Sequence, residues 1–519
     1  RLAPVLKAAS PPRMVRSRPV ARSAAAELAD GSAAADEGGG FGRARTVGWL
    51  EAAATDPTAA AGTTCLQVSP DDDVLPMLQA LAATGNCLVI LPDVRRARWL
   101  AGRLRRSGVR THLQPSQWSG GFSGGLVIGS RSAVWAPVTD LRSIVVLDEH
   151  DESLQAERVP TWHAREVAVE RARRSGARCL LVSTVPSLAA RHLAERMNRT
   201  PRSQQRRGWP VVEVIDRRDD ELGFTNLFSS RLVEIVRSVD SAVMVLNRKG
   251  RARLLACRSC GELVRTENGL HLMIEDDGGL IAPASGERRP LVCAHCGGTA
   301  LKRLQLGVTR AAEELSRLLG RPVIELGAAG RSRGDGGLGG VVLGTEAALH
   351  AVDRCDVVGF LDFDQELLAP RYRAGEQALA LVALAARLVG GRQDGGRIVV
   401  QSRVPDHRVI RAAVAGDPDR FAEAEAAQRA ELGFPPHGAL AEISGAGAAD
   451  QAARLLAAGD AEPARWPSMR VLGPRSDGRY LVSVPASADT DPWSTLADLL
   501  ASVPRSKQRV RIAVDPSRV

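Results

Sequence analysis

The chain has 519 residues and a net charge of +10 at pH 7, and 44% of its residues are hydrophobic while 25% are charged. This balance is typical of a soluble globular protein, and the length is too great for one hydrophobic core. The longest unbroken apolar run, residues 378–386, is far shorter than the roughly 20 residues of a membrane-spanning helix, so we expect no membrane partner. The positive charge favours a polyanion.

Residues 1–63 are expected to form a basic, low-complexity linker. The first 45 residues are rich in proline, alanine, arginine and glycine, and they include the run Gly38-Gly39-Gly40. Such composition is typical of an unstructured connection. The chain begins with Arg1 rather than methionine, so we expect that an N-terminal domain is missing.

From about residue 64 the sequence predicts an α/β lobe over 64–216. Short apolar runs that read as buried strands alternate with amphipathic helices; they lie at 87–92, 126–128, 144–147 and 179–183, and a run at 210–215 is expected to close the lobe. Buried strands that alternate with helices are typical of a parallel sheet covered on both faces.

A second α/β lobe is expected over 217–402 and a mixed α+β domain over 403–519. The second lobe is predicted to contain helices at 228–239 and 376–389, with strands at 242–246, 323–326, 341–343, 357–361 and 398–401. A cysteine-rich insertion at 256–300 interrupts this lobe. The C-terminal domain is expected to turn at Pro435-Pro436.

The strongest chemical signal is a pair of Cys-x-x-Cys motifs in the insertion, formed by Cys257, Cys260, Cys293 and Cys296. A glycine follows each motif, which suits the tight turn of a zinc knuckle. Four thiolates complete a tetrahedral shell and leave no position for water, so we expect one structural Zn²⁺. The alternative is a set of four thiols without metal.

An acidic box, Asp148-Glu149-His150, follows an apolar strand. In nucleotide-driven motors the first acid of such a box binds Mg²⁺ and the second polarises the attacking water. Acids at the end of a strand are also commonly solvated, so the box alone is weak support for catalysis.

A phosphate-binding loop would be expected in residues 66–74, ahead of the strand at 87–92. That region contains Asp71, Asp72 and Asp73 and no glycine, and none of the chain's four lysines lies in a Gly-rich loop. Such a loop needs glycines and a lysine to hold the β/γ-phosphates. We therefore expect no ATP or Mg²⁺ and no catalytic residue. The acidic box is interpreted as vestigial, and Glu149→Gln is expected to leave function unchanged.

Basic side chains provide candidate contacts to DNA phosphates. We single out Arg131, Arg248, Lys249 and Arg251. Phosphate contacts of this kind give binding that is independent of base sequence and sensitive to salt. The alternative for each residue is an ordinary place on a solvated surface.

Taken in order, several motifs resemble those of the PriA family, the primosomal proteins that restart replication at stalled forks. The segments are LVILPDV at 88–94, VIGSRSAVWAP at 127–137, LNRKG at 246–250, GFPPHG at 433–438 and VDP at 514–516. They are similar to the family's LVLVPEI, VIGTRSALFAP, LNRRG, GYPPFG and terminal VDP, and the match covers most of the chain from about 64. The resemblance implies two helicase-like (RecA-like) parallel-sheet lobes, a zinc-binding insertion in the second and an α+β C-terminal domain.

The sequence departs from the family in each part of the ATP machinery. The family's GVTGSGKT loop is absent, and alignment of His150 with the family's DEEHD box puts Leu147 where the Mg²⁺-binding aspartate belongs. Arg387 stands one position from either arginine of the family's QVAGRAGR motif. The inner two of the family's four Cys-x-x-Cys pairs are missing, which leaves one complete zinc site. The pattern is similar to degenerate PriA forms of high-GC Gram-positive bacteria.

The resemblance implies a replication-restart primosome protein that binds forked DNA and helps reload the replicative helicase, without ATPase or helicase activity of its own. The alternative is an ATP-dependent 3′→5′ DNA helicase of the primosome, and a zinc-ribbon transcription factor fits neither the length nor the motif order. The implied partners are forked or single-stranded DNA, the replicative helicase or its loader, and single-strand-binding protein. The implied location is the cytoplasm, at the nucleoid. The family's N-terminal domain, which recognises a DNA 3′ end, has no counterpart in residues 1–45.

Overall fold

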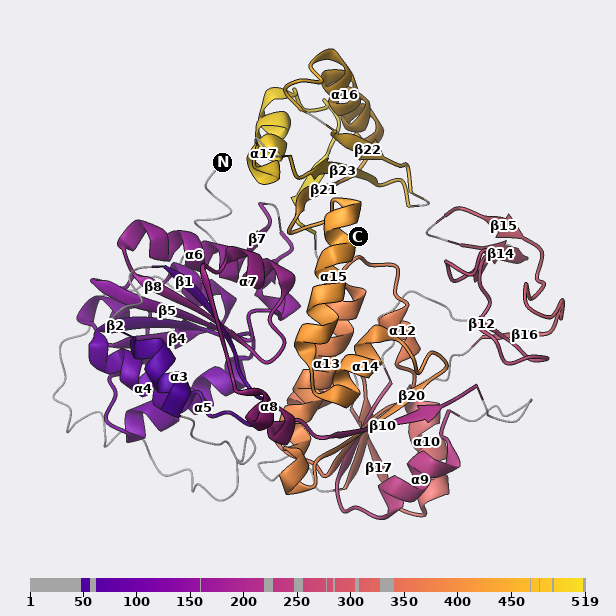
Figure 1. Cartoon of the computed structure of the whole chain (residues 1–519), viewed down its shortest axis with the longest axis horizontal. Helices are drawn as coiled ribbons and strands as arrows, with labels where there is room; N and C mark the ends of the chain where they lie inside the picture. The colour runs from indigo at the N-terminus through magenta and orange to yellow at the C-terminus, as the bar shows by residue number, and fades with distance from the viewer. Residues whose placement is uncertain are drawn as a thin grey trace.

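The computed structural model describes residues 48–56, 62–158, 160–218, 227–246, 255–276, 278–282, 285–303, 308–326, 340–466, 468–475, 477–487 and 490–516. Figure 1 shows two sheet-based lobes, a small domain at the C-terminal end and a separate group of short strands. Most of the expected linker lies outside the described residues. Its predicted end at residue 63 is wrong, because α3 (Gly48–Thr55) buries Leu50 in the core of the first lobe.

The first lobe is built on a sheet of seven strands in the order β3-β4-β2-β5-β8-β1-β9, and all pairs of neighbours run parallel. This confirms the predicted parallel sheet. The strands are β1 (Thr63–Gln67), β2 (Asn86–Ile90), β3 (Thr111–Leu113), β4 (Leu126–Gly129), β5 (Leu141–Leu147), β8 (Arg178–Ser183) and β9 (Arg196–Arg199).

Separate apolar clusters cover the two faces of this sheet. Strands β2 and β5 supply side chains to both clusters in alternation, as Val89 and Ile90 show, because successive side chains of a strand point to opposite faces. The helices of the lobe are α4 (Leu75–Thr84), α5 (Val94–Arg106), α6 (Ala164–Ser175) and α7 (Leu188–Leu193), with 3-10 turns at Trp118–Ser123, Arg131–Trp135 and Glu152–Leu154, and β6 (Gln155–Ala156) pairs with β7 (Trp162–His163).

The second lobe contains a sheet of six parallel strands in the order β10-β20-β19-β11-β18-β17. The strands are β10 (Val211–Asp216), β11 (Ala242–Val245), β17 (Val323–Leu326), β18 (Val341–Gly344), β19 (Val357–Phe360) and β20 (Arg397–Ser402). The run at 210–215 was expected to close the first lobe, and this prediction is wrong. Strand β10 pairs along its whole length with β20, so α8 (Arg202–Gly208) leads out of the first lobe.

Helices on both sides of this second sheet complete the lobe. They are α9 (Ser230–Arg237), α10 (Val308–Leu319), α11 (Ala347–Ala351), α12 (Asp364–Leu367), α13 (Ala374–Val389), α14 (Arg408–Ala415) and α15 (Pro418–Leu432), with a 3-10 turn at Arg392–Asp394. Val409, Ile410 and Phe421 lie in the same core as the strands. The predicted start of the C-terminal domain at 403 is therefore too early, since α14 and α15 pack on the second lobe.

The C-terminal domain is a four-stranded antiparallel sheet in the order β22-β23-β21-β24, with two helices on it. Its elements are β21 (Gly438–Ser444), α16 (Ala448–Ala461), β22 (Arg470–Leu472), β23 (Tyr480–Pro485), α17 (Pro492–Ser502) and β24 (Arg511–Val514). The α+β character is as predicted. The expected turn at Pro435-Pro436 contains a cis peptide bond.

The cysteine-rich insertion forms a small module with its own core. Strand β12 (Leu255–Cys257) pairs with β16 (Leu301–Arg303), and β13 (Ile274–Asp276), β14 (Gly279–Ile281) and β15 (Arg288–Arg289) form a second small sheet. Leu255, Val264, Met273, Leu280 and Ala282 are buried together. In Figure 1 this module stands to the side of the second lobe.

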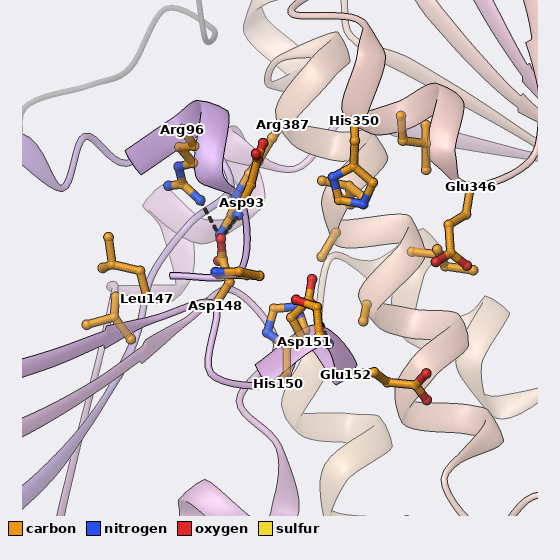
Figure 2. A pocket seen from close by; sticks show the side chains of 18 of the residues that line it. Asp93, Arg96, Leu147, Asp148, His150, Asp151, Glu152, Glu346, His350 and Arg387 are labelled. Atoms are coloured by element: carbon orange, nitrogen blue, oxygen red, sulfur yellow. Dashed lines mark hydrogen bonds and ion pairs between the residues drawn. The ribbon is translucent and has the colours of Figure 1, made fainter. Parts of the chain in front are cut away.

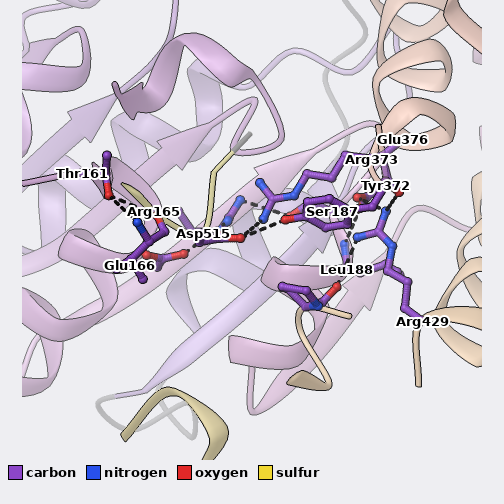
Figure 3. Close-up of polar contacts among 12 residues, drawn as sticks. Thr161, Arg165, Glu166, Ser187, Leu188, Tyr372, Arg373, Glu376, Arg429 and Asp515 are labelled. Atoms are coloured by element: carbon purple, nitrogen blue, oxygen red, sulfur yellow. Dashed lines mark hydrogen bonds and ion pairs between the residues drawn. The ribbon is translucent and has the colours of Figure 1, made fainter. Parts of the chain in front are cut away.

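A buried carboxylate joins the C-terminal domain to the second lobe (Figure 3). Asp515 follows β24 and accepts hydrogen bonds from the Tyr372 hydroxyl (2.9 Å) and from the Arg373 guanidinium (2.6 Å). The Thr161 hydroxyl in the first lobe bonds to the backbone of Val514 (3.1 Å). Burial raises the pKa of Asp515, but Arg373 and the hydrogen bonds outweigh it and the net pKa is lowered. The first lobe, the second lobe and the C-terminal domain thus meet at Val514 and the ionised Asp515.

We predict that Asp515→Asn lowers the stability of the chain by roughly 3 kcal/mol, because Arg373 loses its buried counter-charge. Asparagine tolerates the left-handed backbone of this position (φ 46°), so the effect reports the charge. Thermal unfolding measures it. Asp477→Asn, which removes an acid from a more exposed pair with Arg479, is the control and should change the midpoint little. Equal midpoints for both variants would contradict the role given to Asp515.

Candidate metal centre and inter-lobe cleft

The four predicted ligands Cys257, Cys260, Cys293 and Cys296 are brought together by the two sides of the small module. The Sγ atoms of Cys257 and Cys296 lie 3.5 Å apart and those of Cys260 and Cys293 lie 3.7 Å apart. All four sulfur atoms lie within 4.8 Å of one another. No other group of three or more metal-binding side chains converges in this way among the residues that the structure describes.

Glycines shape the two turns that present the sulfur atoms. Gly261 and Gly297 have φ of 76° and 73°, a left-handed conformation that glycine adopts without steric cost. Their amides donate to the carbonyls of Cys257 (3.0 Å) and Cys293 (2.9 Å) and close each turn. A Cβ atom at Gly298 would lie 3.2 Å from the Cys257 sulfur. The prediction that glycines shape these turns is confirmed.

The donor set fits a tetrahedral metal ion. A Zn–S bond of about 2.3 Å requires sulfur atoms about 3.8 Å apart, which is close to the two separations found here. The Ser259 amide also donates to the Cys257 sulfur (3.4 Å), and such a contact favours a thiolate. Four thiolates leave no open position for a substrate, so a metal ion here would be structural.

An arginine attaches the metal module to the second lobe. The Arg403 guanidinium donates to the carbonyl oxygen of Gly261 (2.8 Å), and the Arg403 amide donates to Asp364 (2.8 Å). Asp364 also accepts from the Ser402 hydroxyl (2.5 Å). The cysteine turn is therefore held at the ends of β19 and β20.

A cavity of about 1320 Å³ separates the two lobes. Its first wall is formed by the 69–74 loop, the start of α5 and the turn after β5, and its second wall by α11 and α13. Figure 2 shows His150, Asp151 and Glu152 of the first lobe facing Glu346 and His350 of the second. Acidic side chains outnumber arginines among the lining residues, and a surplus of carboxylates disfavours an anionic ligand.

Asp148 is ion-paired with arginines from both lobes. Arg387 on α13 reaches across the cleft and donates to both carboxylate oxygens of Asp148, one of them at 2.6 Å, and Arg96 on α5 donates to the same group. Burial raises the pKa of Asp148, but the charges of Arg387 and Arg96 lower it well below its usual range. Asp148 is thus neutralised by guanidinium groups of the protein itself.

The carboxylates of the 69–74 loop bind the loop itself. Asp72 accepts from the Ser69 amide (2.7 Å), Asp73 accepts from the Leu75 amide (3.0 Å), and Asp71 accepts from the Ser69 hydroxyl (2.6 Å). In a phosphate-binding loop such amides point at the ligand. Here the Ser69 amide is bonded to Asp72 and the Leu75 amide to Asp73, so these two amides already have partners.

Glu149 and His150 are turned away from Asp148 and have structural partners. Glu149 has no solvent exposure, and its carboxylate accepts from Arg165 (2.9 Å) and from the amide and hydroxyl of Ser187 (2.7 and 2.8 Å). Nδ1 of His150 lies 2.7 Å from the Ser183 hydroxyl. Sequence reasoning treated this box as one vestigial unit and missed that Glu149 fixes the start of α7.

The candidate DNA contacts remain predictions. Arg131 donates to the carbonyl oxygens of Ser153 (2.8 Å) and Gln155 (2.6 Å) and holds the turn beside the cleft. Arg248, Lys249 and Arg251 lie outside the described residues. The sequence analysis did not single out Arg96 as a cleft residue. The signal that could have found it is its place on α5, an arginine-rich helix at the edge of the sheet.

No helix in the described part of the chain is long and apolar enough to cross a membrane. No protein-family model matches the chain. Solved structures give weak likenesses, such as the Escherichia coli DExH-box NTPase HrpB, which is 14% identical with a TM-score of 0.34 over 68% of this chain and 41% of that one. These likenesses are too weak to add to what the sheets of this chain show.

Curated relatives give a clear result. The replication restart protein PriA of Bacillus subtilis is 26% identical over 404 residues, 70% of this chain and 50% of the relative. The probable replication restart protein PriA of Mycobacterium leprae is 30% identical over 510 residues, 85% of this chain and 74% of the relative. The chain belongs to the PriA family. It spans about half the length of the first two curated PriA relatives it matches.

We predict that Glu149→Gln destabilises the first lobe by roughly 3 kcal/mol, because Arg165 is left buried without its counter-charge. This replaces the expectation of a silent substitution. Glu170→Gln on α6 is the control, since its pairs with Arg173 and Arg174 are exposed and the melting temperature should not move. Chemical denaturation of both variants measures the difference, and a Glu149→Gln curve that overlays the wild type would refute the buried role.

We predict one bound metal ion per chain and its loss in Cys257→Ser. Structural zinc contributes roughly 10–16 kcal/mol of apparent binding free energy in small domains, so the module should unfold without it while both lobes persist. Elemental analysis and protease sensitivity of the module test this. His295→Ala is the matched control, because His295 is exposed beside the cluster and is not one of the four ligands. Full metal content in Cys257→Ser would disprove the ligand set.

Proposed function

We propose that the chain is a replication-restart primosome protein that binds forked or single-stranded DNA and helps to reload the replicative helicase without hydrolysing ATP. Membership of the PriA family supports the primosome role. The observation that carries the rest is the cleft in which Asp148 is already neutralised by Arg96 and Arg387.

Nucleotide binding would require this cleft to give up contacts that it already has. The Ser69 amide is bonded to Asp72 and the Leu75 amide to Asp73, and a triphosphate brought against these carboxylates would be repelled. The alternative, an ATP-dependent 3′→5′ helicase, needs a cation to hold the β/γ-phosphates. Arg96 and Arg387 line the cleft, and both are bound to Asp148.

We infer that the metal is a single Zn²⁺ and that the module it folds serves as a docking platform for primosome partners. The four-thiolate set supports zinc. The partners we propose are the replicative helicase or its loader and single-strand-binding protein, at the nucleoid in the cytoplasm. Arg131, Arg248, Lys249 and Arg251 remain the proposed phosphate contacts.

The proposed function predicts binding to a model replication fork with no turnover of ATP above background. We would measure phosphate release from γ-labelled ATP and fork binding in the same samples, at two salt concentrations, since phosphate contacts weaken as salt rises. Asp148→Ala is the control for contaminating enzymes, because trace turnover that is equal in both proteins does not come from this cleft. DNA-stimulated turnover that Asp148→Ala abolishes would restore the helicase alternative.

A further inference from the structure

We propose that the protein holds its own lobes closed, through a clamp formed by Arg387 of the second lobe and Asp148 of the first. The clamp goes beyond the proposed primosome function, and of that function it rests only on the proposal that the cleft does not use nucleotide. The role that it gives to the cleft is to hold the two lobes in one arrangement.

The contact between the two lobes at this point is multidentate. Arg387 donates two hydrogen bonds to the carboxylate of Asp148 and a third, of 3.2 Å, to the hydroxyl of Thr184. The side chains of Arg387 and Asp148 are 21% and 9% exposed. A planar guanidinium that meets a carboxylate through two parallel bonds is both strong and directional, and partial burial limits its screening by salt.

Asp148 is also held from within its own lobe. Arg96 on α5 donates to Asp148 from the same lobe, which orients the carboxylate toward the cleft. Arg387 lies in the last turn of α13, a helix packed along one side in the core of the second lobe, and the negative end of a helix favours a cation there. The clamp therefore loses little side-chain freedom when it closes.

A ligand moves two lobes only to the extent that it binds one arrangement better than the other. In this cleft the charges that a metal–nucleotide complex would contact are already paired with each other, across the lobes at Asp148 and within the loop at Asp72 and Asp73. Closure is therefore a property of the unliganded chain, and nucleotide leaves it unchanged.

A second set of contacts lies away from the cleft and would act as a pivot. Asp419 on α15 pairs with Arg191 (2.5 Å) and Arg199 (2.8 Å) of the first lobe, and Glu376 accepts from the Leu188 amide (2.8 Å). These contacts do not involve the cleft residues. When the clamp is broken, the lobes are expected to stay joined at this pivot and to spread at the cleft.

The test is the distance between two spin labels in the full chain, measured by pulsed electron resonance. Ser107 at the end of α5 and Glu234 on α9 are exposed sites in different lobes. The labels should be attached through genetically encoded residues, because the chain's eight cysteines would compete for a thiol reagent. The variants are R387Q and D148N; asparagine suits the left-handed backbone of Asp148 (φ 51°).

We expect one narrow distance distribution in the wild type, unchanged by Mg-ATP or by its non-hydrolysable analogue. R387Q and D148N should shift and broaden the distribution. R96Q removes the guanidinium that holds the same carboxylate from its own lobe but leaves the pair across the lobes, so it should broaden the distribution less than R387Q does. R98Q, an exposed position on the same helix, should behave as wild type.

A distribution that is equally narrow in R387Q, D148N and the wild type would overturn the clamp, and so would a wild type that shifts on addition of Mg-ATP. If one variant fails to fold, the other still decides, since each removes a different half of the pair. The measurement uses neither DNA nor partner proteins. Its outcome is therefore independent of whether the chain binds forks.

Discussion

The carboxylate of Asp148 accepts guanidinium groups from both lobes and so links the two lobes across the cleft. It stands at the end of the central strand β5 with a left-handed backbone, which turns its side chain into the cleft. Because an ionised acid at such a place must be compensated, the chain needs a cation there, and Arg387 brings it from the opposite lobe. Arg96 and Arg387 together supply this compensation, and Arg387 thereby links the second lobe to the first.

Arginine is the means by which this chain joins its parts. Its planar group forms several directed bonds at once, which a lysine ammonium does not. Arg373 binds the C-terminal strand at Asp515, Arg403 binds the metal module at Gly261, and Arg191 binds α15 at Asp419. Some of the many arginines in the sequence therefore form the ion pairs and hydrogen bonds that connect separately folded regions.

Local patterning of the sequence was sufficient to predict both parallel sheets and the pairing of the Cys-x-x-Cys motifs that cluster in the fold. It failed wherever the answer depended on partners distant in the chain. An apolar run such as 211–216 does not say which sheet it joins, and the placement of β10 beside β20 required the fold. Likewise Glu149 and Asp148 are neighbours in the sequence, but Glu149 faces the core and Asp148 faces the cleft. Only their ion pairs, Glu149 with Arg165 and Asp148 with Arg387, reveal this difference.

The metal module has too small a core to be stable on its own. Five buried apolar residues bury little surface, and domains of this size usually depend on a metal or disulfides. The large lobes contain extensive cores that need no ion. With the proposed metal site, the supply of metal would then decide whether this module is folded. A cell short of metal would accumulate chains with intact lobes and an unfolded module. These chains would be as abundant as before but would present a different surface.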